Sequence, residues 1–178
     1  MMIWIWSIPD NYPNKRIGEY VEGSGTDRFV FREGKLIHDE VIQPKIIFDC
    51  AEKYLTDILP NSAQLIIVSN RVLKILNDVC PKDIQVFNAN VYVGEKRIPN
   101  YYLINLTHIV EVVNKKESEF TTILETDAIL SFEKIVYKND NLGQFHLVRN
   151  SDYRSHVLVS EYLKNIFERE KITGVQFI

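Results

Sequence analysis

The chain has 178 residues, of which 46% are apolar and 25% are charged, and its formal net charge is −3. These values are those of an ordinary globular protein that can bury its own core, so we expect a single domain over residues 1–178. The small charge argues against nucleic acid and membrane surfaces as partners, and the two cysteines make neither a disulfide framework nor a zinc site, so no cofactor or metal is expected.

The N-terminal segment Ile3-Trp4-Ile5-Trp6 alternates β-branched and aromatic residues, which predicts a strand. The segment has no basic start and its apolar run is too short for a signal peptide or a membrane span, so we expect a cytoplasmic protein. Two interpretations of the tryptophans remain open, an aromatic binding shelf and packing against the core. Residues 9–28 are rich in Pro, Gly and polar residues and are typical of a loop.

Two elements are predicted before residue 60. Residues 28–37 suggest a short hairpin that turns at Gly34, and the adjacent His38, Asp39 and Glu40 form either a metal or acid–base site or an ordinary solvated surface. A helix is predicted over residues 50–59, because capping residues and a closing proline bracket apolar residues on one helical face: Phe48, Ala51, Leu55, Ile58 and Leu59.

The clearest feature of the chain is a repeat, since residues 65–87 and 156–178 align without a gap. Equivalent positions include Val68 and Val159, Ser69 and Ser160, Ile75 and Ile166, and Gln85 and Gln176. Each copy has an apolar β-branched run, a serine suited to cap a helix, apolar residues at helical spacing and a second apolar run. Both copies therefore predict a strand, a Ser-capped helix and a strand. Each copy is short for a βαβ unit, so the second strand is either antiparallel to the first or part of another sheet.

Between the repeats, strands are predicted at residues 91–93, 101–104, 120–124, 132–137 and 145–148, with a tight turn at 139–143. Residues 105–113 fit a helix behind Asn105 or a strand, and we favour the helix. On that helix His108 and Glu111 would lie one turn apart, as a ligand pair or as a surface contact. The polar residues Arg149, Asp152, Tyr153 and Arg154 are predicted to form a loop, either a recognition surface or simply solvated.

These elements together predict a fold of the α+β class. We expect a mixed, largely antiparallel sheet in one or two parts, with three or four helices that include the two Ser-capped helices of the repeat.

Several segments resemble a family of bacterial immunity proteins from polymorphic toxin systems, whose type example comes from myxobacteria. The resemblance covers roughly residues 65–178 and is carried by Tyr101-Tyr102-Leu103-Ile104-Asn105, by residues 112–118 and 145–149, by Val159-Ser160-Glu161-Tyr162-Leu163-Lys164 and by Gly174-Val175-Gln176-Phe177. Glu111 and Asn114 stand where the family pattern has its acidic positions, and the first ninety residues match little of it apart from the first repeat and the Trp-rich start. The shared residues are mainly ones that pack or cap helices.

The resemblance implies a non-enzymatic cytoplasmic protein that binds and neutralises a cognate protein toxin. The four histidines, at positions 38, 108, 146 and 156, form no recognisable catalytic set in the sequence. A small enzyme of unrecognised type and a regulatory or structural protein-binding domain are the alternatives. Trp4, Tyr153 and Arg154 are candidate anchors for a partner, while the binding surface, the toxin and the oligomeric state stay open.

Overall fold

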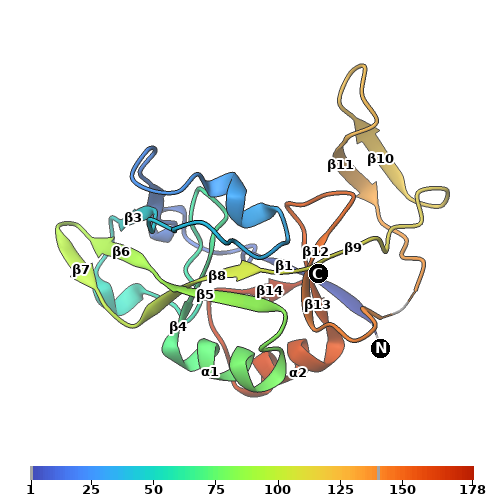
Figure 1. The fold of residues 1–178 in the computed structure, drawn as a ribbon. Helices are drawn as coiled ribbons and strands as arrows, with labels where there is room; N and C mark the ends of the chain where they lie inside the picture. The colour runs from blue at the N-terminus through green and yellow to red at the C-terminus, as the bar shows by residue number, and fades with distance from the viewer. Residues whose placement is uncertain (1, 140) are drawn as a thin grey trace.

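A computed structural model describes residues 2–139 and 141–178, so Met1 and Asp140, which belongs to the predicted turn at 139–143, lie outside the described residues. The described chain forms four sheets and two α-helices (Figure 1). The helices are α1 (Asn70–Val79) and α2 (Glu161–Arg169), and three 3-10 turns are η1 (Asn14–Arg16), η2 (Arg28–Arg32) and η3 (Glu52–Tyr54).

The sheets differ in size and in their position along the chain. The five-stranded sheet has the order β14 (Gln176–Phe177), β1 (Ile3–Ser7), β13 (Val157–Ser160), β12 (Leu147–Asn150) and β9 (Ile109–Val110). The three-stranded sheet has the order β4 (Ile66–Ser69), β8 (Tyr101–Leu106) and β5 (Ile84–Asn88). The four-stranded sheet has the order β2 (Glu19–Tyr20), β3 (Lys45–Phe48), β6 (Asn90–Val93) and β7 (Lys96–Ile98), and β10 (Glu119–Thr122) pairs with β11 (Ile129–Lys134).

Both copies of the repeat form a strand, an α-helix and a strand, and in each copy a strand from elsewhere in the chain lies between the two. Strand β8 separates β4 from β5, and β1 separates β13 from β14, always in antiparallel pairing. The two strands of each copy are therefore parallel to each other within one sheet, which settles the question left open by the short length of the repeat.

The inserted strands occupy equivalent registers in the two copies. Tyr102 of β8 pairs with Val68, and Trp4 of β1 pairs with the equivalent Val159. On the other edge, Asn105 pairs with Gln85, and Ser7 pairs with the equivalent Gln176. Strand β1 thus completes the second copy in the way that β8 completes the first, although the two strands lie at distant points of the sequence.

The two serines cap the helices of the repeat. Ser69 Oγ accepts a hydrogen bond from the main-chain N–H of Val72 at 3.4 Å, and Ser160 Oγ accepts one from Leu163 at 3.2 Å. The helices lie side by side (Figure 1) and share one apolar core with the strands above them. Their buried residues in this core are Val72, Leu76, Leu163 and Phe167.

The three-stranded sheet is buried on both faces, which explains why its strands are continuous apolar runs. Ile66 and Ile104 belong to the core shared with the helices, whereas Ile67 and Leu103 belong to a second core with β3 and β6. A third, smaller core forms on the other face of β12 and β13, around Val148 and Leu158.

The prediction of three or four helices is wrong, since the described residues form two α-helices, and the sheet divides into four parts. Residues 50–59 contain only the single turn η3. Ile58 packs in the core shared with the helices and its neighbour Leu59 packs in the second core. One helical face cannot point into two cores, so tertiary packing overrides the local pattern.

Two further predictions are wrong for related reasons. Residues 105–113 are not helical: β8 ends at Leu106 and β9 follows, and the adjacent Val112 and Val113 are both buried, which one side of a surface helix does not allow. In place of the hairpin predicted over residues 28–37, Arg28–Arg32 form η2, and Asp27 caps this turn by accepting from the N–H of Phe29 at 2.8 Å.

Candidate functional site

The candidate ligand residues of the sequence are not brought together. Residues 38–40 are exposed, and the ring of His108 lies against Phe145, with centroids 4.6 Å apart. Glu111 forms an ion pair with Lys138, which lowers the pKa of its carboxyl group. Within residues 2–139 and 141–178, no group of three or more His, Cys, Asp or Glu side chains could hold a metal ion.

The tryptophans of β1 pack against the core that the helices share. The ring of Trp6 contacts Phe167 edge to face, with centroids 5.7 Å apart, and the Lys164 ammonium lies 4.4 Å from the centre of the Trp4 ring. The contacts of both tryptophans are those of core packing, and Trp6 in addition lines a cavity.

His146 and Ser160 form the hydrogen bond most like a catalytic pair, with 2.8 Å between Nδ1 and Oγ. Asp83 is buried nearby, but its carboxylate accepts from the main-chain N–H groups of His146 and Leu147, at 2.8 and 3.1 Å, and not from the imidazole. The Ser160 hydroxyl is also engaged as the helix cap. These contacts fix the start of β12 against the start of α2, so we interpret them as structural.

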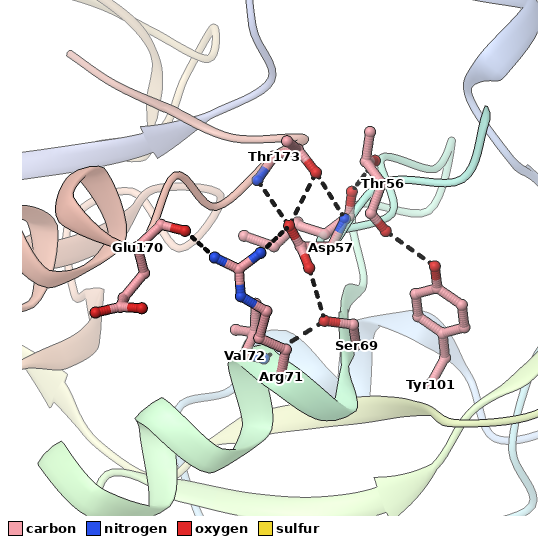
Figure 2. Close-up of polar contacts among 9 residues, drawn as sticks. Thr56, Asp57, Ser69, Arg71, Val72, Tyr101, Glu170 and Thr173 are labelled. Atoms are coloured by element: carbon pink, nitrogen blue, oxygen red, sulfur yellow. Dashed lines mark hydrogen bonds and ion pairs between the residues drawn. The ribbon is translucent and has the colours of Figure 1, made fainter. Parts of the chain in front are cut away.

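A second polar cluster joins the two repeats (Figure 2). The Asp57 carboxylate accepts from Thr173 N at 3.1 Å, from Thr173 Oγ1 at 3.0 Å and from Ser69 Oγ at 3.2 Å. Arg71 lies 3.7 Å from the same carboxylate and donates to the main-chain oxygen of Glu170. Asp57 therefore ties the beginning of α1 to the turn after α2, and every polar group in the cluster has a structural partner.

Arg149 is different, because it is a buried cation without a carboxylate partner. The sequence places it in a polar loop, but the structure extends β12 through Asn150 and leaves Arg149 only 2% exposed. Its Nη1 donates to the main-chain oxygen of Arg154 at 3.1 Å and its Nη2 to that of Phe31 at 3.2 Å, while Nε has no hydrogen-bond partner among the described residues.

A second guanidinium increases the positive charge around Arg149. Arg32 of η2 donates to the main-chain oxygen of Ala63 at 2.8 Å. Burial, and then the charge of Arg32, lower the pKa of Arg149 to about 10, so the guanidinium stays protonated at neutral pH. Within the described part of the chain, neither arginine lies within 4 Å of a carboxylate oxygen.

Arg149 lines a cavity of about 380 Å³ between β1, β13 and residues 58–66. Tyr153 and His156 line the same cavity, and their rings meet edge to face with centroids 4.6 Å apart. Burial lowers the pKa of the His156 imidazole, and its Nδ1 has no partner among the described residues. The predicted polar loop is therefore partly right: Tyr153 faces a cavity, whereas Arg154 is exposed.

An aromatic contact connects this cavity to a projecting hairpin, which consists of β10, β11 and the residues between them. Phe132 of β11 lies 6.0 Å from Tyr153 and 5.9 Å from His156, measured between ring centroids. Phe132 also contacts Phe120 of β10 at 5.8 Å. Phe132 thus anchors the base of the hairpin on the wall of the cavity.

The hairpin stands away from the other sheets (Figure 1) and has an exposed apolar end. Leu124 is 91% exposed, and Ile123 and Leu130 are exposed as well. Residues 117–134 carry five acidic side chains and one lysine, a net charge of −4. The sequence predicts strands in this region but not the projection. The apolar residues beside Glu125-Thr126-Asp127 are the signal for an exposed tip.

Comparison with known proteins identifies the family. A search of the curated proteins finds no match to the chain. The model of the immunity protein family Imm11 matches residues 19–178, and this match begins well before the region in which the sequence motifs show a resemblance. Immunity protein families are generally non-enzymatic and neutralise toxins. Since the match spans most of the chain, the protein belongs to the Imm11 immunity protein family.

Proposed function

We propose that this protein protects the cell that makes it by binding a cognate protein toxin in the cytoplasm, without chemistry of its own. The observation that carries the proposal is the family match over residues 19–178. The polar clusters at Asp57 and at Ser160 support the non-enzymatic part, because their hydrogen bonds are those of helix caps and of contacts between segments.

The projecting hairpin is the surface that we assign to toxin binding. An exposed leucine on a narrow projection is a suitable contact, because a pocket on the partner can remove its apolar surface from water. The net charge of −4 over residues 117–134 favours a basic surface on the toxin and would accelerate encounter at low salt. The two strands present this tip on a paired backbone, so little conformational entropy is lost on binding.

Growth rescue tests the proposal directly. The product of the neighbouring gene is expressed in a heterologous bacterium, alone and together with this chain, and the two proteins are then co-purified. We expect the neighbour to stop growth, this chain to restore it and the two to elute together. A toxic neighbour that is neither neutralised nor bound would refute the proposal for that pair of proteins.

Matched substitutions test the surface. Leu124→Ser removes the apolar tip, while Ile42→Ser removes another exposed apolar side chain, 62% exposed, in the loop before β3. We expect Leu124→Ser to weaken toxin binding by about tenfold or more, because full burial of a leucine side chain contributes about 1.5–3 kcal/mol, and Ile42→Ser to leave binding unchanged. If Leu124→Ser and Ile42→Ser change toxin binding equally, the hairpin is not part of the interface. Replacing Glu125 and Asp127 with lysine should slow association mainly at low salt.

A further inference from the structure

The cavity beside Arg149 is large and apolar enough to hold a small organic group. Its volume of about 380 Å³ falls within the range of small-molecule sites. Apolar side chains make up most of its walls, among them Ile5, Trp6, Ile58, Leu65, Ile66 and Val157. Seven of the eighteen lining residues are polar or charged, so a ligand can combine apolar contacts with polar contacts that orient it.

The guanidinium of Arg149 is the charged group of this cavity. Two of its five N–H groups donate to main-chain oxygens, of Arg154 and of Phe31, and these bonds hold the guanidinium in place. Nε and one N–H on each terminal nitrogen remain as donors. A buried charge that lacks an ion-pair partner is costly, and Arg32 nearby adds repulsion, so an anion that reaches Arg149 gains both Coulomb energy and hydrogen bonds.

We propose that this cavity binds a carboxylate attached to an apolar body, with the carboxylate on Arg149 and the apolar part against the walls around Trp6. A planar carboxylate matches the fork of a guanidinium and carries the single negative charge that one arginine can balance. His156 lines the same cavity, and its Nδ1 has no hydrogen-bond partner among the described residues. The site goes beyond the proposed toxin binding and does not depend on it.

Trp6 lines the cavity, so its fluorescence reports occupancy in the full-length protein. The probe is hexanoate, its uncharged counterpart is hexanamide, and inorganic phosphate tests for unspecific anion binding. We expect saturable fluorescence changes with hexanoate, at least tenfold weaker binding of hexanamide and no saturable response to phosphate. A hexanoate response that does not saturate by about 10 mM, or equal binding of acid and amide, would overturn the proposal.

Three variants locate the site. Arg149→Met removes the charge, and Ser155→Phe places a large ring at the exposed edge of the cavity while keeping Arg149 itself. Arg154→Gln is the matched control, because it removes an exposed charge from the same loop and keeps the main-chain oxygen that Arg149 contacts. We expect the first two to weaken hexanoate binding at least tenfold and the control to change it less than twofold. Should Arg149→Met fail to fold, Ser155→Phe decides, and unchanged binding in that variant refutes the site.

The carboxylate can come from a free small molecule or from an acidic residue of a protein partner. Adding hexanoate to the complex with the neighbouring gene product distinguishes these sources. If hexanoate and the neighbouring gene product compete for this protein, the carboxylate comes from the partner. If both bind at the same time, the natural ligand is a free acid. The first hexanoate titration uses this protein alone, without any toxin. A lack of hexanoate binding can therefore be distinguished from a lack of growth rescue.

Discussion

The substitution Gly174→Ala tests the contact between the turn after α2 and residues 56–58, which lie before the first repeat. Gly174 follows α2 with a φ of +86°, and a Cβ atom at this position would lie 2.1 Å from the main-chain oxygen of Ile58 and 2.6 Å from Thr56 Oγ1. Gly174→Ala therefore meets two separate penalties, a left-handed backbone and a clash with residues 56–58.

The size of the effect follows from these contacts. The left-handed backbone costs an L-residue about 1 kcal/mol. Relief of the clash moves residues 56–58 away from Thr173, which stretches the bond of 3.0 Å from Ile58 N to Thr173 O and the bonds of 3.0 and 3.1 Å from Thr173 to Asp57. Loss of one or two such bonds costs about 0.5–1.5 kcal/mol each, so with the backbone penalty we expect Gly174→Ala to lower the free energy of unfolding by about 1.5–4 kcal/mol.

Gly94→Ala is the matched control. Gly94 also has a positive φ, +57°, but no atom lies within 4 Å of an added Cβ, so only the backbone penalty of about 1 kcal/mol applies. Urea unfolding followed by tryptophan fluorescence gives both values, provided that the denaturant dependence is unchanged. A difference below about 0.5 kcal/mol between the two variants would refute the close approach of Gly174 to Ile58.

Three further predictions concern the second repeat and the cavity. Phe167→Ala should lower the free energy of unfolding by about 3–5 kcal/mol because the ring is buried, and a loss below about 1 kcal/mol in urea would contradict the packing of α2. Ser160→Ala should cost about 1 kcal/mol in the same assay, and no loss would argue against the cap. Burial holds the pKa of His156 below its ordinary 6.5, so the unfolded chain takes up this proton first as the pH falls. Its contribution to the free energy of unfolding should be complete above about pH 6.5 and decrease as the pH falls through the pKa of the folded state. His156→Gln should flatten the dependence of the free energy of unfolding on pH over this range. An unchanged dependence in the variant would contradict the burial of His156.

The repeats could be recognised without a structure because their signals are local. A β-branched run, a serine before the helix and apolar residues at a period near 3.6 all lie within a few residues of one another. The same kind of reasoning failed at residues 50–59, where the apolar spacing fits a helix but Ile58 and Leu59 enter different cores. A periodic pattern predicts a helix only when a single core lies beside it.

The candidate site shows a similar limit. Arg149 stands out in the sequence as a polar residue near a loop, yet its burial follows from η2, whose Phe31 oxygen it contacts across 118 positions of the chain. The sequence signals an exposed tip only through the apolar residues beside Glu125-Thr126-Asp127, and it does not show that the strands on either side project from the other sheets.

The sequence by itself determined the repeated strand, capped helix and strand, and its motifs pointed to the immunity protein family. Only the tertiary structure decided that β1 completes the second repeat as β8 completes the first, that the chain has two α-helices, and that a buried arginine lies beside an apolar cavity. The physical reason is range: caps and periodicity act between near neighbours, whereas strand pairing and burial depend on contacts between segments that the sequence keeps more than a hundred residues apart.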